Sequence, residues 1–418
     1  MRLTVLHPEV KLLIAEFAGG LMPIRLPDDE LLSLVIKTQK EAILAAKMKG
    51  LFSFYVPALP SSTVITTSLI TAFFDDDDEP LTIRTPLLCD DDFSRGIVEI
   101  LKYDEVDIYF FDEHNYEWMS FRTVLEDNGS CLIGDEDIHL LGYHPETVKS
   151  IHGVLNDWFG SRTQEDDECA IQAVFKEELS PQDIFVLDMT PEVNGYQGSS
   201  GYRHDTLTRT DPGYHQERDI SACLLRAFEP KQIMMNPRRK DTFKEILDHL
   251  VLTDKLAILI QAKDSPTSEA GITRTLERKR RSTHSQIDNA IRQINGASRY
   301  LKRQTTAKLV VGDNDVDVSL GKRRVIGLAI VKELFDDEGE AYAAACRKLS
   351  GLNGGGMVMD YNSFHAFTHR FRSETEFVRA LETLVERVQS SGWISVKDEV
   401  FAGVLDWVEQ VRTSDPDH

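Results

Sequence analysis

The chain lacks several features that would assign it to a common protein class. Its 418 residues contain no apolar run of about 18 or more residues, so we expect no membrane span. The five cysteines are widely separated and form no Cys-x-x-Cys pair, which argues against a zinc site and against a disulfide framework. They are Cys89, Cys131, Cys169, Cys223 and Cys346. Unpaired cysteines favour a reducing, cytoplasmic setting.

Positive charge is scarce in the first half of the chain. Residues 1–205 hold 38 Asp and Glu but only 15 Lys and Arg, whereas the remainder holds 31 acids and 32 bases. Within residues 231–303 the balance reverses, with 16 bases and 8 acids. An acidic chain of net charge −22 thus contains one distinctly basic segment. Such a segment is typical of a surface that binds phosphate groups.

The length exceeds that of a usual single domain, so we expect two domains. Residues 193–213 are rich in Gly, Ser, Thr and Tyr without a clear period, and they predict a linker or mobile loop. An acidic α+β domain of unassigned role would then span residues 1–192. A second domain would span residues 214–418.

The acidic half shows patterns of both helices and strands. The first fifty residues are interpreted as helical, and residues 53–72 favour strands because they are rich in Val, Ile, Thr and Tyr. Residues 106–124 predict two strands around a polar turn. A helix is expected over residues 145–159, and further strands over residues 170–189.

The second half alternates regularly between strands and helices. A continuous apolar segment at 256–263 predicts a buried central strand, and strands are also expected at 231–235, 246–252, 325–331 and 357–360. The expected helices are 214–229, a basic helix or helix pair at 273–303, 336–349, 362–371 and 374–390. This order predicts an α/β fold, with a sheet covered by helices.

Three residues on the predicted hairpin carry the chemistry. Gln261 and Lys263 share one face of their strand, because side chains alternate along a strand. A turn centred at 253–255 would bring Asp248 beside Gln261. Carboxylate and amide oxygens bind Mg²⁺, which polarises a phosphate and activates water, and a lysine can stabilise the developing charge. This combination is suited to phosphodiester hydrolysis.

The stretch ILDHLVLTDKLAILIQAKDS, from Ile246 to Ser265, resembles the core hairpin of PD-(D/E)XK nucleases. Its nearest variant is that of Mrr-type restriction endonucleases, in which Gln replaces the acid before x-Lys. The resemblance implies that Asp248 is the metal-binding acid, Gln261 the second ligand or water holder, and Lys263 the catalytic lysine. It also implies a restriction-endonuclease-like mixed sheet flanked by helices, and cleavage of DNA with Mg²⁺, or Mn²⁺, as cofactor. The setting would be prokaryotic restriction or defence against phage.

A second resemblance lies upstream of the hairpin. Glu217-Arg218 resembles the Glu-Arg start of the first helix in related Holliday-junction resolvases. Glu217 would then be a further catalytic, metal-binding acid. This acid would matter because the neutral Gln261 leaves the cation one negative charge short.

Basic residues follow the hairpin. If the span 273–303 is helical, Arg274, Arg278 and Arg281 lie on one face and, with Lys279, could contact a DNA backbone. Gln286 and Gln293 are candidates for the supporting glutamine that related nucleases carry on this helix.

Two alternatives remain at this point. The nuclease fold could serve as a weak or inactive scaffold that binds nucleic acid or a partner protein, or the substrate could be RNA. The acidic domain could dock a partner protein, screen the basic cleft or sense a ligand. The sequence leaves the oligomeric state open, a homo-oligomer included.

Overall fold

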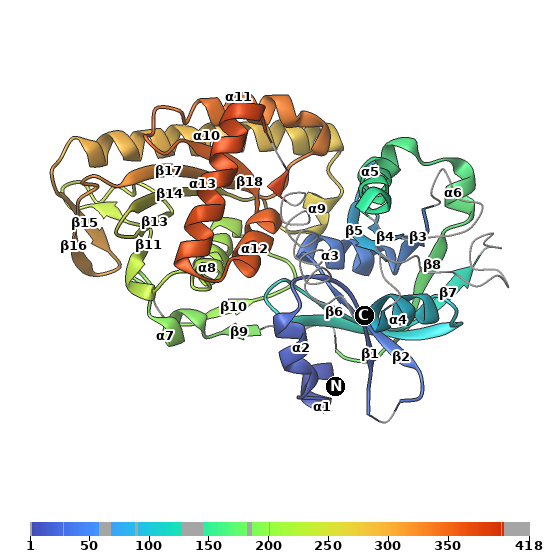
Figure 1. The fold of residues 1–418 in the computed structure, drawn as a ribbon. Helices are drawn as coiled ribbons and strands as arrows, with labels where there is room; N and C mark the ends of the chain where they lie inside the picture. The colour runs from blue at the N-terminus through green and yellow to red at the C-terminus, as the bar shows by residue number, and fades with distance from the viewer. Residues whose placement is uncertain are drawn as a thin grey trace, which may run out of the picture. The chain divides into compact units, whose positions relative to one another are not determined.

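The computed structural model contains two compact units, each with its own sheet (Figure 1). It describes residues 2–27, 29–57, 68–87, 91–127, 145–181, 186–199, 201–393 and 395–396. The first unit comprises Met1–Val186, Thr206–Thr208 and Thr267–Leu276, and the second comprises Leu187–Asp205, Arg209–Pro266 and Glu277–His418. Most of the expected linker, residues 193–213, therefore belongs to the second unit.

The first unit is built on an eight-stranded sheet with the order β1-β2-β6-β7-β8-β3-β4-β5. Only β2 and β6 pair in parallel, so the sheet is mixed. The strands are β1 (Gly20–Arg25), β2 (Leu32–Lys37), β3 (Leu51–Tyr55), β4 (Ser68–Phe73), β5 (Leu81–Pro86), β6 (Glu105–Phe111), β7 (Glu117–Asp127) and β8 (Ile171–Glu178). The helices are α1 (Leu3–Leu6), α2 (Val10–Glu16), α3 (Lys40–Lys49), α4 (Asp92–Ile100), α5 (Pro145–Ser161), α6 (Gln164–Glu168) and α9 (Glu269–Ile272).

The sequence patterns of the first unit were interpreted correctly in part. The expected hairpin is β6 and β7, and the expected helix at 145–159 is α5. The helical interpretation of the first fifty residues is wrong for residues 20–37, which form β1 and β2. In β2 five of six residues are buried, so its apolar residues run on without alternating and resemble a buried helix. The middle of the strand-rich stretch 53–72 lies outside the described residues.

The second unit contains a five-stranded mixed sheet with the order β11-β13-β14-β17-β18. The pairs from β11 to β14 are antiparallel, and β14, β17 and β18 are parallel. These strands are β11 (Ile233–Met235), β13 (His249–Leu252), β14 (Leu256–Lys263), β17 (Arg324–Val331) and β18 (Gly356–Asp360). Two smaller sheets are formed by β9 (Val186–Asp188) with β10 (Arg203–Asp205), and by β12 (Arg238–Arg239), β15 (Ala307–Val311) and β16 (Asn314–Val318).

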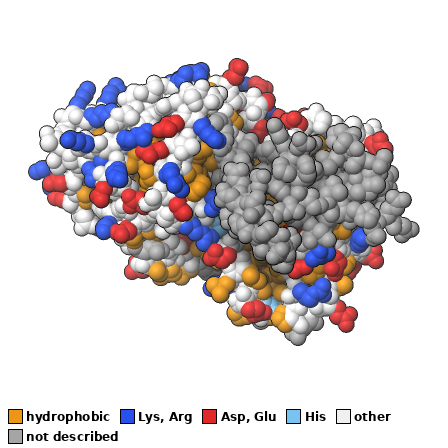
Figure 2. All heavy atoms as spheres, in the orientation of Figure 1, with side chains coloured by type: hydrophobic (Ala, Val, Ile, Leu, Met, Phe, Trp, Pro, Cys, Tyr) orange, Lys and Arg blue, Asp and Glu red, His pale blue; other side chains and the backbone are white. Residues whose placement is uncertain are grey.

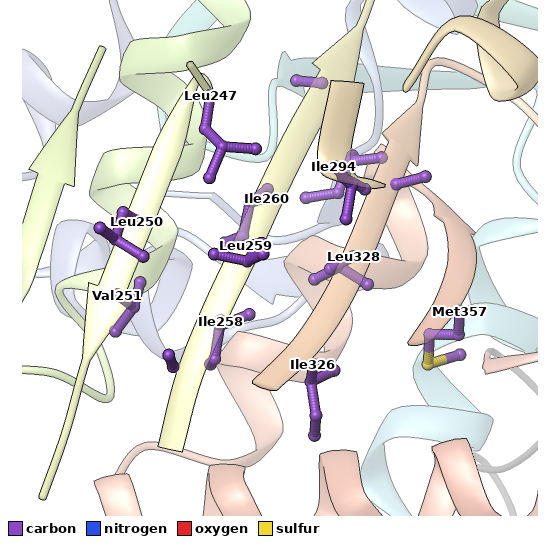
Figure 3. Close-up of a cluster of buried hydrophobic side chains, with 14 of the residues drawn as sticks. Leu247, Leu250, Val251, Ile258, Leu259, Ile260, Ile294, Ile326, Leu328 and Met357 are labelled. Carbon is purple, nitrogen blue, oxygen red and sulfur yellow. The ribbon is translucent and has the colours of Figure 1, made fainter. Parts of the chain in front are cut away.

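The helices of the second unit and its core follow the expected alternation. The helices are α7 (Thr190–Asn194), α8 (Pro212–Leu224), α10 (Leu276–Lys302), α11 (Gly339–Arg347), α12 (Tyr361–Arg370) and α13 (Glu374–Ser391). Figure 3 shows apolar side chains of β13, β14 and β17 together with Ile294 of α10. In β14 every residue but Lys263 is buried, which confirms the predicted central strand. The unit is therefore a mixed α/β fold. None of the described helices has the length and apolar character needed to cross a membrane.

Candidate active site

The β13–β14 hairpin places Asp248 beside Gln261. His249 pairs with Ile260, so Asp248, one residue earlier, lies opposite Gln261. The Oδ2 atom of Asp248 accepts a hydrogen bond of 2.7 Å from the Ala262 N–H, which fixes the carboxylate against β14. This register is the one expected from the sequence.

Burial differs among the four residues expected to form the site. Asp248 is 4% exposed and Gln261 is 1% exposed, so both lie in the protein interior. Lys263, two residues after Gln261 on the same face of β14, is half-buried, as is Glu217 on α8. The buried pair can position a group, and the half-buried pair remains within reach of a substrate.

Glu217 is attached to the end of the sheet by Asn236. The Asn236 Nδ2 atom donates a hydrogen bond of 2.7 Å to Oε2 of Glu217, and the Asn236 N–H donates one of 2.8 Å to the Asp248 carbonyl. Asn236 has a φ of 52°, in the left-handed region that few residues other than glycine adopt. One residue in an unusual conformation thus links the Glu217 carboxylate to the main chain of Asp248.

A third carboxylate, Glu245, joins this group and was missed from the sequence. Its position, three residues before Asp248, was the available signal, but nothing in the pattern distinguished it from a loop acid. Burial raises the pKa of Glu245, and the negative charge of Glu217 raises it further. We refer to Glu217, Glu245 and Asp248 as the carboxylate cluster.

The pKa of Asp248 shows how strongly the cluster is perturbed. Burial raises the pKa of this carboxyl to about 6, and Glu245 adds to the rise. The Lys263 ammonium and the Ala262 N–H oppose it by favouring the ionised form. Perturbed acids of this kind are concentrated at functional sites.

Glu217 responds to the same neighbours. Burial raises its pKa, and Asp248 contributes to the rise, whereas the hydrogen bond from Asn236 and the charge of Lys263 lower it. The structure therefore brings Glu217, Asp248, Gln261 and Lys263 into one electrostatic group. A group with three carboxylates and one ammonium attracts a further cation.

The chain segment after Lys263 is held by two polar side chains. Gln286 of α10 donates to the Ser265 Oγ atom at 2.9 Å, and Lys332 donates to the Ser265 carbonyl at 2.9 Å. Gln286 thus holds the segment that follows β14. Gln293 is exposed on the same helix.

A buried ion network fixes α8, the helix that carries Glu217. Asp219 accepts hydrogen bonds from Arg203, and from the Arg209 Nη1 atom at 2.5 Å. Arg203 also binds Asp188 at 2.7 Å, and Arg209 binds Asp205 at 2.9 Å. All five side chains are less than about a tenth exposed. The network therefore ties β9, β10 and the following turn to α8.

The structure separates the four basic residues expected to bind nucleic acid. Arg274 lies in the bend between α9 and α10 and belongs to the first unit, so it does not share a helix face with the others. Ile272 packs in the core of the first unit, and the helix expected from residue 273 begins only at Leu276. Lys279 is only 9% exposed and is poorly placed to contact phosphate.

Arg278 and Arg281 remain exposed on α10, one turn apart. Arg281 pairs with Glu277, which neutralises part of its charge. Figure 2 likewise shows single Lys and Arg side chains of the second unit interspersed with Asp and Glu on the face in view. The basic character of this segment is therefore distributed and does not form one continuous stripe on that face.

The donors near Gln261 fit a hard divalent cation. Glu217 and Asp248 offer carboxylate oxygens and Gln261 offers an amide oxygen, the ligand types that Mg²⁺ binds. Within the described part of the chain, the buried Gln261 Nε2 atom has no hydrogen-bond partner, so this amide is not fixed by the protein alone. The described residues contain no group of three His, Cys, Asp or Glu side chains arranged to hold a metal ion. Mg²⁺ usually takes one or two protein carboxylates and completes its shell with water and phosphate.

The comparisons with known proteins add no assignment to this geometry. No family model, no curated protein and no solved structure matches the chain.

Proposed function

We propose that the second unit is a divalent-metal-dependent nuclease that hydrolyses DNA phosphodiester bonds. The observation that carries this proposal is the convergence of Glu217, Asp248, Gln261 and Lys263 at one end of the β13–β14 hairpin. The mixed sheet with flanking helices and the resemblance of the hairpin to PD-(D/E)XK nucleases support it.

Each residue has a distinct task in this proposal. Asp248 and Glu217 would hold a Mg²⁺ or Mn²⁺ ion, with the Gln261 amide oxygen as a further ligand or as acceptor for a bound water. When bound, the ion would polarise the scissile phosphate and lower the pKa of the attacking water. Lys263 is half-buried beside the cluster, so its ammonium can face the phosphate and stabilise the charge that develops there.

Plasmid cleavage by the full-length chain tests this proposal. Wild type should nick or cut plasmid DNA in Mg²⁺ or Mn²⁺ and should be inactive in EDTA. Lys263→Ala should lose at least about a hundred-fold in rate, because an electrostatic contact made in the transition state is removed. Lys255→Ala is the matched control, since Lys255 is exposed in the turn before the same strand. Equal cleavage by wild type and Lys263→Ala would overturn the proposal.

The neutral Gln261 favours a second candidate, a nuclease fold that binds nucleic acid without cutting it. Wild type that binds DNA but cleaves nothing in either metal would support this candidate. Digestion of structured RNA in parallel with plasmid and single-stranded DNA tests the nature of the substrate. Turnover of RNA alone would show that the substrate is RNA and not DNA.

A further inference from the structure

A basic turn with an exposed aromatic residue lies next to the carboxylate cluster. The turn runs from Arg238 to Lys244 in the second unit and contains four bases and one acid among seven residues. Phe243, near its end, is 64% exposed. We refer to this segment as the basic turn.

The backbone holds Phe243 outward in a conformation that is unfavourable for it. Its φ is 53°, in the left-handed region that disfavours bulky side chains. Two hydrogen bonds close the turn, from the Phe243 N–H to the Arg239 carbonyl at 2.8 Å and from the Arg239 N–H to the Lys244 carbonyl at 2.9 Å. A large apolar ring is thus displayed to solvent on a closed turn, where a glycine would be less strained.

The base of the turn is anchored to the rest of the second unit. Arg238 and Arg239 pair with β15, and the Arg239 guanidinium lies 4.2 Å from the ring centroid of Tyr300. Lys240 pairs with Asp315. The side chains of Arg239 and Lys240 therefore hold the turn in place, whereas those of Arg238 and Lys244 are exposed at its two ends.

The basic turn leads directly into the candidate active site. Glu245 follows Lys244 and forms a β-bridge with Arg238. Two residues of extended chain span about 7 Å, so the Cα atom of Phe243 lies within that distance of the Glu245 Cα atom. Glu245 in turn interacts with Glu217 and Asp248. The residue that carries the exposed ring therefore lies next to Glu245, one member of the carboxylate cluster.

A second exposed aromatic residue lies near the cluster on the helix that carries Glu217. Tyr214 lies one turn before Glu217 on α8 and is 39% exposed. The Arg218 guanidinium lies 3.7 Å from the centroid of the Tyr214 ring. Stacked aromatic and guanidinium groups are a common surface for nucleotides. An aromatic residue and a base therefore accompany the cluster both on α8 and on the basic turn.

We propose that the basic turn binds an unpaired DNA base beside the carboxylate cluster, with the Phe243 ring stacked on the base. Arg238 and Lys244 contact the flanking phosphates. This inference rests on the proposed nuclease function and gives its substrate class, DNA with a single-stranded or branched segment. A ring stacks on any base, because every base has a π face, so this contact selects unpaired nucleotides without selecting sequence.

Binding of a single-stranded DNA oligonucleotide that contains 2-aminopurine tests this proposal. The full-length chain is used in EDTA, so that no cleavage is needed for the measurement. Wild type should change the 2-aminopurine fluorescence, and Phe243→Gly should weaken binding by about ten-fold, the loss expected for one stacked base. Glycine suits the left-handed backbone, so the temperature of thermal unfolding of this variant should be unchanged or slightly higher than that of wild type.

Two variants control for other causes. Phe243→Trp keeps an aromatic ring and should bind single-stranded DNA as wild type does. Tyr202→Ala removes another exposed aromatic residue of the same unit and should also bind as wild type does. Equal single-strand affinity of Phe243→Gly and wild type would overturn the inference. Phe243-dependent binding of RNA without binding of DNA would overturn it too.

The plasmid assay separates this result from failure of the nuclease proposal. If wild type cleaves plasmid but Phe243→Gly binds normally, only the stacking inference fails. If wild type cleaves neither plasmid nor single-stranded DNA in Mg²⁺ or Mn²⁺ yet shows Phe243-dependent binding of single-stranded DNA, the base-binding turn stands and the nuclease proposal fails.

Discussion

The Oδ2 atom of Asp248 and the main-chain nitrogen of Ala262 are 2.7 Å apart, and the hydrogen bond between them uses one carboxylate oxygen. Ala262 lies between Gln261 and Lys263 on β14, so the strand that carries these two side chains also orients the acid. This hydrogen bond fixes the carboxylate group of Asp248, so the hairpin itself also sets the orientation of its second oxygen. A one-residue slip of the register would place Gln261 and Lys263 on the other face of the sheet. The geometry of the candidate site therefore depends on correct strand pairing.

Asn236 should prove to be a positioning residue for Glu217. Asn236→Ala removes the 2.7 Å hydrogen bond to Glu217 and leaves a side chain in the left-handed region. The Mg²⁺ concentration for half-maximal cleavage should rise by about ten-fold or more, as it does when residues that orient metal ligands are removed. A metal titration of plasmid nicking measures this change.

Asn236→Gly separates the two effects. Glycine lacks the same amide but accepts a φ of 52°, so stability should recover while the higher Mg²⁺ requirement persists. A glycine variant with the Mg²⁺ requirement of wild type would show that the hydrogen bond to Glu217 has no part in metal binding.

The sequence predicted the centre of the second unit well, for a physical reason. The segment LAILIQAK is apolar until its last residues and follows a short polar turn, so β14 and its partner could be placed to within a few residues. Alternation along the strand then assigned Gln261 and Lys263 to one face. These features depend on the local sequence alone, and the folded structure keeps them because the strand is buried in the core.

The remaining features depend on tertiary contacts and were not visible in the sequence. The position of Glu245 depends on the pairing of Arg238 with β15, and the position of the Asn236 side chain depends on its left-handed backbone conformation. The segment Thr267–Leu276 belongs to the first unit because Ile272 packs in that core, which no local pattern indicates. Within residues 273–303, where a helix or a helix pair was expected, one helix therefore begins only at Leu276.

Substitution of Asp219 should be among the most destabilising single changes in the second unit. Asp219→Asn removes the charge that faces both Arg203 and Arg209, which are almost fully buried. Breaking a buried ion pair by removing one partner costs about 3–5 kcal/mol. Hydrogen–deuterium exchange of the β14 amides in increasing urea should detect the loss in the unfolding free energy of this unit.

An exposed ion pair provides the comparison. Glu277→Gln removes the partner of Arg281 on the surface of α10 and should cost less than about 1 kcal/mol. Similar losses for Asp219→Asn and Glu277→Gln would contradict a structural role for the buried network.

Glu117 in the first unit should make stability fall as pH rises. Its side chain is 2% exposed at the start of β7, and burial raises the pKa of its carboxyl above the ordinary value of 4.5. The folded state then holds a proton that the unfolded state has released, so this group destabilises the fold once pH exceeds its folded pKa. Glu117→Gln should stabilise the first unit at pH 8 by on the order of 1 kcal/mol.

The gain from Glu117→Gln should shrink toward pH 4.5, where the unfolded carboxyl becomes protonated as well. Thermal unfolding at pH 8 and at pH 4.5 measures both values. Glu105→Gln, at an exposed position at the start of β6, is the matched control and should change the stability at pH 8 much less than Glu117→Gln does. A gain for Glu117→Gln that is independent of pH would exclude ionisation as its cause.

Glu245 should raise the affinity of the carboxylate cluster for its cation. Its negative charge acts on Glu217 and Asp248. Glu245→Gln removes one charge while keeping the shape, so the Mg²⁺ concentration for half-maximal plasmid cleavage should rise roughly three- to ten-fold. The rate at saturating Mg²⁺ should change much less, because Asp248 and Lys263 remain in place.

Asp254→Asn removes an exposed acid from the β13–β14 turn and should leave the Mg²⁺ requirement unaltered. A Glu245→Gln variant that loses its rate at every Mg²⁺ concentration would instead place Glu245 in direct contact with the reacting groups.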